Sequence, residues 1–153
     1  MPFAENDNVT LHYEIRGTRG PHVAFIQDAC VGAWTWAWII DSVASHYQAI
    51  AFDARGCGNS EMGTISIEHI TDDLEAILGD ADIQRVHLVG CGLGSQIALE
   101  YVRKYSRARS LLLIAAGRPR YGGERERLLN PDPITSLEPY VNDWLDDEEK
   151  RSL

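Results

Sequence analysis

The sequence predicts an α/β domain with a mostly parallel sheet and helices on both faces. Two short runs, VAFI at residues 23–26 and AIAF at residues 49–52, are wholly apolar, which is typical of strands covered on both faces. These runs alternate with stretches of helical periodicity. Such alternation indicates right-handed crossovers between parallel strands. A length of 153 residues is enough for one ordinary domain.

The first half of the chain predicts three strands and one helix. A turn signal, NDN at residues 6–8, precedes residues 9–16, where apolar side chains alternate with polar ones such as His12. This alternation predicts a half-buried strand that forms one arm of a hairpin. The two apolar runs are the next strands, and the segment WTWAWIIDSVASHY between them predicts a helix.

The second half predicts two further helices and two strands. Ser66 is the expected N-cap of a helix whose apolar residues fall on one face at spacings of three and four. Gly79 is expected to be the left-handed residue that ends this helix. The segment RVHLVG then predicts a strand, and SQIALEYVRKY predicts a helix with Val102 among its inward residues.

The amino-acid composition and the hydrophobic pattern of the sequence change after Gly117. Residues 118–153 contain four prolines, a Gly-Gly pair and an acidic end, without a strand pattern. We therefore expect the α/β domain to occupy residues 1–117. Residues 118–153 are expected to form a lid-like or C-terminal acidic helical segment.

Composition and charge exclude several classes of protein. A formal net charge of −9 disfavours a nucleic-acid partner, which requires a basic face. No apolar run approaches the roughly 18–20 residues of a membrane span, and the N-terminus has no signal-peptide pattern. We therefore expect a cytoplasmic protein that binds neither nucleic acid nor membrane. Three cysteines without metal-finger spacing predict no disulfide framework and no metal site, and we expect no cofactor.

Three motifs carry a resemblance to a known family. FIQDACVGAWTWAW begins at Phe25 in the first apolar run, and FDARGCGNS, which begins at Phe52, fits the pattern D-x-R-G-x-G-x-S. VHLVGCGLGSQIALEYVRKY contains a sharp strand-to-helix turn, in which the pattern G-x-S-x-G would place a serine at Gly92. On these motifs and their spacing, residues 2–117 resemble the N-terminal half of an α/β-hydrolase, the fold of many esterases, epoxide hydrolases and haloperoxidases.

The resemblance implies a truncated α/β-hydrolase fold with the strand order 1-2-4-3-5-6. It places a nucleophile elbow at Gly90, Cys91, Gly92 and Gly94. By family position, the backbone amides of Ala29 and Leu93 are the oxyanion-hole candidates. Several residues in the strand-end loops are candidates for lining a ligand pocket: Gln27, Asp28, Cys30, Trp34, Asp53 and Cys57.

The usual catalytic triad of the family has no counterpart among these residues. Gly92 has no side chain to attack a substrate, and none of the five histidines follows the elbow. Gln27 and Asp28 stand where the family usually has His-Gly, and a carboxylate there would repel the negative charge that develops in ester hydrolysis. We therefore expect a catalytically impaired, hydrolase-like protein that binds a small apolar ligand or a protein partner.

Three alternatives stay open from the sequence. A second chain could complete an ester-type hydrolase by providing the acid and the histidine. Cys30, Cys57 and Cys91 could form a thiol cluster, either as a metal site or with Cys91 as a substitute nucleophile, although no histidine is placed to lower a thiol pKa. The glycine-rich run could bind a dinucleotide, but it lacks the acid about 20 residues further on that this fingerprint requires.

The last strand predicts an interaction surface. SLLLIAA begins at Ser110 and ends at Ala116, and no further strand pattern follows that would pair with its outer edge. A long apolar edge strand is a template for association. We expect this edge to be covered by another copy of the chain, by a different protein partner, or by residues 118–153.

Overall fold

The computed structural model describes residues 2–28 and 31–116, so the predicted segment 118–153 lies outside the described residues. Six strands form one sheet: β1 (Phe3–Asn6), β2 (Val9–Arg16), β3 (His22–Ile26), β4 (Gln48–Phe52), β5 (Val86–Cys91) and β6 (Ala108–Ile114). Their order across the sheet is β1-β2-β4-β3-β5-β6, which confirms the predicted order. β2 is antiparallel to β1 and β4, whereas β4, β3, β5 and β6 run parallel to one another.

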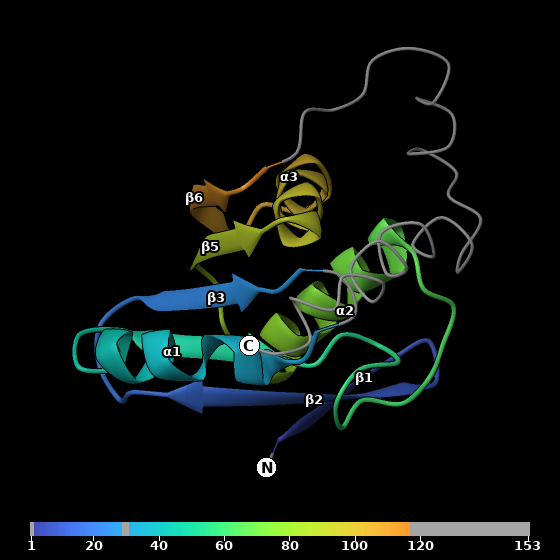
Figure 1. Cartoon of the computed structure of the whole chain (residues 1–153), viewed down its shortest axis with the longest axis horizontal. Helices are drawn as coiled ribbons and strands as arrows, with labels where there is room; N and C mark the ends of the chain where they lie inside the picture. The colour runs from blue at the N-terminus through green and yellow to red at the C-terminus, as the bar shows by residue number, and fades with distance from the viewer. Residues whose placement is uncertain (1, 29–30, 117–153) are drawn as a thin grey trace, which may run out of the picture.

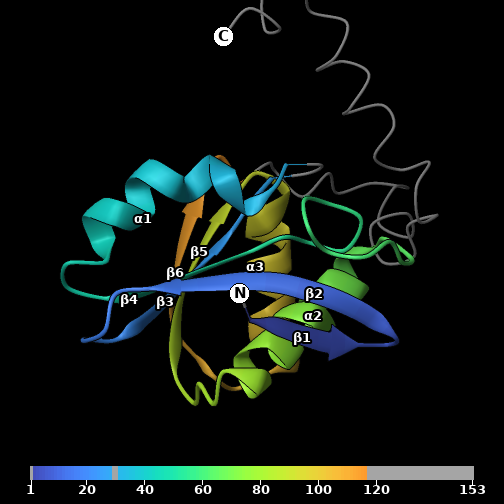
Figure 2. The same ribbon diagram turned by 90° about the horizontal axis from the view of Figure 1, so that it is seen from below.

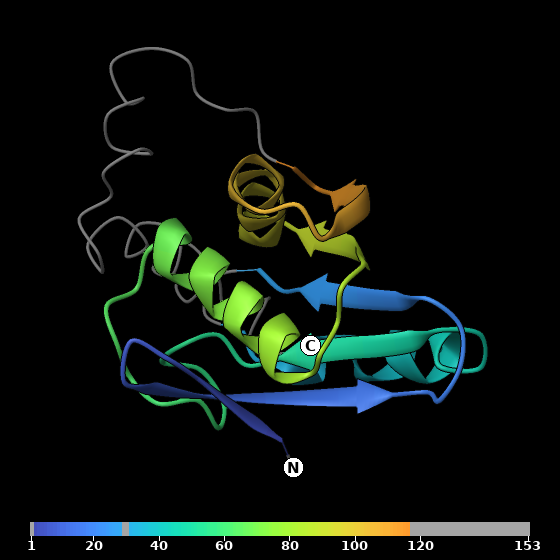
Figure 3. The same ribbon diagram turned by 180° about the vertical axis from the view of Figure 1, so that it is seen from behind.

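Helices cover both faces of this sheet. A 3-10 turn (η1, Ala33–Trp36) and α1 (Ala37–Val43) lie on one face, and Figure 2 shows α1 on the opposite side of the strands from α2 (Ile67–Asp80) and α3 (Leu93–Lys104). Figure 1 views the molecule from the α1 side and Figure 3 from the α2 side. The single helix predicted over residues 34–47 is wrong in extent. The 3-10 turn brings Trp36 inward and leaves Trp34 and Trp38 exposed.

Two apolar cores, one on each face, hold the layers together. Alternate side chains of β3 enter different cores, Ala24 and Ile26 toward α2 and α3, and Val23 and Phe25 toward α1. Residues 23–26 of β3 and residues 49–52 of β4 are all apolar because both faces of these strands are covered. On the α1 side, the Phe25 and Trp36 rings pack with their centroids 5.2 Å apart.

The N-terminal hairpin turns where the sequence predicts. Asp7 and Asn8 both have positive φ, 51° and 58°, as the central residues of a two-residue hairpin turn require. The placement of His12 on the polar face is wrong, since its side chain is buried. The loop after β4 covers that face of β2, and the backbone N–H of His12 donates to Ser60 Oγ at 2.9 Å.

The two long helices differ from prediction in two details. Ser66 caps α2 as expected, because its Oγ accepts a 3.1 Å hydrogen bond from the backbone N–H of His69. Gly79 does not end α2, which continues to Asp80, and Asp82 takes the left-handed conformation with φ of 53°. Val102 of α3 was expected inward but is 40% exposed, because the face of α3 that carries it lies away from the sheet.

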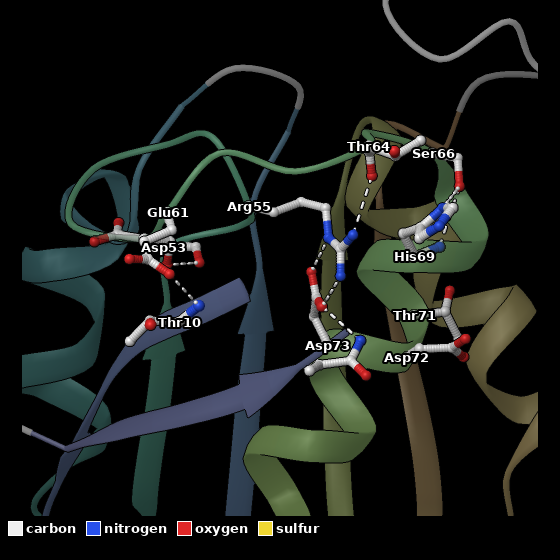
Figure 4. A network of polar contacts seen from close by, with 12 residues as sticks. Thr10, Asp53, Arg55, Glu61, Thr64, Ser66, His69, Thr71, Asp72 and Asp73 are labelled. Carbon is white, nitrogen blue, oxygen red and sulfur yellow. Dashed lines mark hydrogen bonds and ion pairs between the residues drawn. The ribbon is translucent and has the colours of Figure 1, made fainter. Parts of the chain in front are cut away.

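A buried ion pair anchors the loop after β4 to α2 (Figure 4). Arg55 Nε and Nη2 donate to Asp73 Oδ2 and Oδ1 at 2.8 and 2.6 Å, and Arg55 Nη1 donates to the carbonyl of Thr64 at 3.2 Å. Asn6 Nδ2 also donates to Asp73 Oδ1, at 2.8 Å. Both charged side chains are buried, so this pair fixes the start of the loop against the core.

Candidate functional site

The turn between β5 and α3 has the geometry of a nucleophile elbow. Gly92 lies between the two elements with φ of 54° and ψ of −117°, a conformation that L side chains rarely adopt. The backbone N–H of Gly92 donates to the carbonyl of Ile114 at 3.0 Å. The buried Ser95 Oγ donates to the carbonyl of Gly90 at 2.9 Å. The elbow is therefore held by backbone and side-chain hydrogen bonds to β5 and β6.

The flanking glycines allow the close packing that this turn needs. A Cβ atom at Gly90 would lie within 3.0 Å of the backbone of Gly94 and Ser95. A Cβ atom at Gly94 would lie equally close to the carbonyls of Ile26 and Gln27. Helix α3 can thus approach β3 and β5 only because these positions lack side chains, as the glycine spacing predicts.

The side chain of Asp28 fills the place where a nucleophile would stand. A Cβ atom built at Gly92 would fall within 3.0 Å of Cγ, Oδ1 and Oδ2 of Asp28. In addition, the backbone N–H of Leu93 donates to Asp28 Oδ1 at 2.7 Å. Asp28 therefore takes both the space above the elbow and the amide that would stabilise an oxyanion. The other predicted oxyanion donor, Ala29, lies outside the described residues.

A small cavity opens beside the elbow, at the carboxyl ends of β3, β4 and β5. The volume available to a water-sized group is about 30 Å³. Most of its wall is apolar, and the polar groups come chiefly from the loops that follow β3 and β4. The lining residues are Ile26, Gln27, Asp28, Val31, Phe52, Ala54, Arg55, Cys57, Ile65, Ile70, Leu93 and Ile97.

The structure brings some of the predicted pocket residues together and separates others. Gln27, Asp28 and Cys57 line the cavity, whereas Trp34 and Asp53 are not part of its lining. Trp34 is 72% exposed on η1. Cys30 lies outside the described residues.

Gln27 carries a buried acceptor that has no partner in the part of the chain that the structure describes. Its side chain is 4% exposed, and Nε2 donates to the carbonyl of Phe52 at 2.9 Å, which ties the end of β3 to the end of β4. This hydrogen bond fixes the orientation of the amide group. Oε1 has no hydrogen-bond partner among the described residues. A buried acceptor left in this state costs about 1–3 kcal/mol relative to a paired one.

Asp53 organises the loops around the site without lining the cavity. Its carboxylate accepts hydrogen bonds from the backbone N–H groups of Ala33 at 2.8 Å and Asn59 at 3.0 Å, and lies 3.0 Å from His12 Nδ1. Gly58, with φ of 52°, passes so close to this carboxylate that a Cβ atom there would clash with it. The participation of His12 was missed because its position in an alternating strand predicted solvent exposure.

The two described cysteines do not cluster. Cys57 packs against the core on the α2 side of the sheet, and Cys91 against the core on the α1 side. Burial raises the pKa of the Cys91 thiol, and the nearby Asp28 carboxylate raises it further. A raised pKa reduces the fraction of thiolate, which is the nucleophilic form.

The described residues contain neither a cluster suited to a metal ion nor a helix suited to span a membrane. Across residues 2–28 and 31–116, no group of three or more His, Cys, Asp or Glu side chains is arranged to hold a metal ion. The helices in the same part of the chain are all too short or too polar to cross a membrane.

The sheet order and the elbow together define an α/β-hydrolase fold. A family model described as "Alpha/beta hydrolase family" matches residues 27–152, which is more than half of the chain. The chain therefore belongs to the α/β-hydrolase family.

Two of the curated proteins similar to this chain are hydrolases by name. RutD of Pantoea ananatis, which bears the provisional name of a carbamate hydrolase, is 27% identical over 131 residues, covering 74% of this chain and 47% of its own length. Epoxide hydrolase 3 of Mus musculus is 23% identical over 124 residues, covering 78% of this chain and 34% of its own. The chain thus spans less than half the length of these curated relatives.

Solved structures show the same fold at low sequence identity. Est816, described as an N-acyl homoserine lactone degrading enzyme, superposes with a TM-score of 0.74 at 24% identity, covering 92% of this chain and 56% of that one. The enol-lactonase of Burkholderia xenovorans LB400 superposes with a TM-score of 0.70 at 23% identity, covering 94% and 59%.

Proposed function

We propose that this chain is a non-hydrolytic member of the α/β-hydrolase family that binds a small ligand at the carboxyl edge of its sheet. The observation that carries the proposal is the position of Asp28, whose carboxylate fills the space above Gly92 and accepts the Leu93 N–H. Acyl transfer requires a nucleophile at this point and a donor aimed at the developing oxyanion. Here position 92 carries no nucleophile. The expected donor, the Leu93 N–H, is already hydrogen-bonded to the Asp28 carboxylate.

Neither the Ser95 hydroxyl nor the Cys91 thiol is placed to act as the nucleophile that position 92 lacks. Ser95 is buried, and its hydroxyl is held by the carbonyls of Gly90 and Ile114 at 2.9 and 3.1 Å. The pKa of the Cys91 thiol is raised, and this side chain packs on the α1 side of the sheet. The ligand is instead expected in the apolar cavity that Gln27 and Asp28 border.

Turnover of a short-chain aryl ester, followed to many equivalents, tests this proposal. We expect the purified chain to release product only at the buffer rate. Asp28→Asn and Cys91→Ala variants, measured in parallel, should give the same rate as the unaltered chain. Sustained release that is lost in Asp28→Asn or in Cys91→Ala would contradict the proposal and assign the attack to a carboxylate-activated water or to the thiol.

We also propose that the outer edge of β6 is a contact surface for a second copy, a protein partner or the chain beyond residue 116. In the described residues β6 pairs only with β5. Leu112 and Ile114 of β6 are 57% and 40% exposed, whereas Leu111 and Leu113 pack against the core on the α2 and α3 side of the sheet. Amide hydrogen exchange checks this surface, because residues 110–114 should be protected. Fast exchange of these amides at every protein concentration would contradict the proposal.

A further inference from the structure

One face of β6 carries exposed apolar side chains. Leu111 and Leu113 pack against the core on the α2 and α3 side, so alternation along the strand turns Leu112 and Ile114 to the α1 side. Among the described residues, no β6 side chain belongs to the core on that side. Leu112 and Ile114 are accordingly 57% and 40% exposed. Strands of a parallel sheet normally have both faces covered, so a further layer is expected here.

The neighbouring strand β5 widens this apolar face. Val89 of β5 pairs in register with Leu112, and Cys91 pairs with Ile114. Both β5 side chains are only partly buried, and they pack against the core on the α1 side. These four side chains lie next to one another on the α1 side of the sheet, and we call them the β6 strip.

A segment outside the described residues has a pattern that fits the β6 strip. Residues 139–149 read PYVNDWLDDEE, and a proline is well suited to the first turn of a helix. The apolar residues recur at spacings typical of one helical face: Tyr140, Val141, Trp144 and Leu145. We infer that residues 139–149 form a helix that packs on the β6 strip of the same chain, antiparallel to β6. This inference goes beyond the contact surface proposed for the edge of β6, because it concerns the face of the strand and names its occupant.

The length of the connecting chain fits this contact. The 22 residues 117–138 leave from the carboxyl end of β6, and a helix antiparallel to β6 begins at that same end. An 11-residue helix is about 16 Å long, whereas the seven residues of β6 extend over about 23 Å. The helix therefore fits within the length of the strand. Because a tether of this kind gives an effective concentration of about millimolar, the same chain is favoured over a second copy.

Charge favours the antiparallel direction. The segment ends in four acids, residues 146–149, which are unfavourable near the C-terminus of an isolated helix. Arg85 and Arg109 are exposed at the amino ends of β5 and β6, and neither has an ion-pair partner in the described part of the chain. An antiparallel helix brings its acids to these two guanidinium groups. A parallel helix would instead bring them to the carboxyl ends of the strands, where Asp28 already places a negative charge.

Nuclear Overhauser effects between side chains, measured by NMR on the full chain, test the inference. Helical residues four apart are separated by about 6 Å along the axis, which matches about 6.6 Å between Leu112 and Ile114 along the strand. We therefore expect an effect from the Tyr140 ring to the Ile114 methyl groups and one from the Trp144 indole to the Leu112 methyl groups. Both should be independent of protein concentration.

Two substitutions in the segment give the matched comparison. Trp144→Ala removes the largest apolar side chain of the helix, so the effect from Tyr140 to Ile114 should also be lost. Asn142→Ala changes a position outside the apolar stripe and should keep both effects. Neither substitution alters the described fold, so the backbone shifts of α3 should be the same in both variants and in the unaltered chain.

Several results would overturn the inference: no effect between the segment and the β6 strip, an effect from Tyr140 that Trp144→Ala leaves unchanged, or effects found only between differently labelled chains. Exchanged contacts, Tyr140 with Leu112 and Trp144 with Ile114, would contradict the antiparallel direction. Amide exchange of residues 110–114 on the same sample separates this failure from failure of the proposed edge contact. Protected amides without contacts from the segment would remove only the helix, whereas fast exchange with those contacts present would support the helix and contradict only the edge contact.

Discussion

The backbone N–H of Leu93 donates a 2.7 Å hydrogen bond to Oδ1 of Asp28, a residue 65 positions earlier in the chain. Leu93 begins helix α3, so the carboxylate lies at the positive end of that helix. This bond joins the loop after β3 to the elbow after β5. The side chain of Asp28 thus occupies the space above Gly92, which has no side chain of its own.

Removal of the Asp28 carboxylate should expose the Leu93 amide. In Asp28→Ala we expect faster hydrogen exchange at Leu93, because the described hydrogen bond of that amide is lost. The Gly92 amide is the internal control, since it donates to the carbonyl of Ile114 and should keep its protection. Exchange measured by NMR on both amides in one sample checks this. Equal acceleration at Leu93 and Gly92 would indicate general loosening of the elbow and would contradict the specific bond.

Loss of the Arg55 side chain should destabilise the fold strongly. Arg55→Met leaves the buried Asp73 carboxylate without its two guanidinium hydrogen bonds. Breaking a buried pair in this way costs about 3–5 kcal/mol of the free energy of unfolding. Urea unfolding measures the loss.

The matched control for Arg55→Met is Arg16→Met. Arg16 pairs with Asp41 at 2.9 Å on the surface, where such pairs contribute about 0–1 kcal/mol. Similar losses in the two variants would show that the buried pair does not anchor the loop after β4.

The Tyr13 hydroxyl should make stability fall at alkaline pH. It donates to Asp80 Oδ2 at 2.7 Å, and burial together with this carboxylate raises the pKa of Tyr13 from 10.0 to about 12. Unfolded Tyr13 therefore loses its proton at lower pH than folded Tyr13. Its contribution is fully present below pH 10 and is lost as the pH rises through about 12.

A comparison with Tyr13→Phe isolates this contribution. The difference in the free energy of unfolding between the unaltered chain and the variant should be constant below pH 10 and shrink toward pH 12. Tyr47→Phe, at a side chain that is 41% exposed, is the control for a tyrosine outside the core. A Tyr13→Phe difference that does not change with pH would contradict the role of the Asp80 hydrogen bond.

The sequence predicted those parts of the molecule that depend on local patterns. The glycines at positions 90, 92 and 94 specify the elbow because each is needed by its own backbone or by a neighbouring strand. The apolar runs of β3 and β4 predicted strands with two covered faces, and both faces are covered. The strand order followed from the family resemblance, since spacing alone does not order a sheet.

Contacts between loops that are far apart in the sequence could not be predicted from local patterns. His12 was placed on a polar face because alternation reports only its own strand, whereas the loop containing Asp53 and Ser60 covers it. The replacement of His-Gly by Gln27 and Asp28 signalled a changed site. The direction of the Asp28 carboxylate and the unpaired Gln27 Oε1 depend on how three strand ends meet, which the sequence pattern does not give.

A double-mutant cycle between positions 28 and 92 tests the central claim most directly. Gly92→Ala adds only the Cβ atom that Asp28 excludes, so its cost should be larger in the unaltered chain than in the Asp28→Ala background. The backbone strain at φ of 54° is the same in both backgrounds and cancels. Urea unfolding should give a coupling free energy of about 0.5–3 kcal/mol, as for residues in contact. Equal costs in the two backgrounds would show that Asp28 does not occupy the place of the nucleophile.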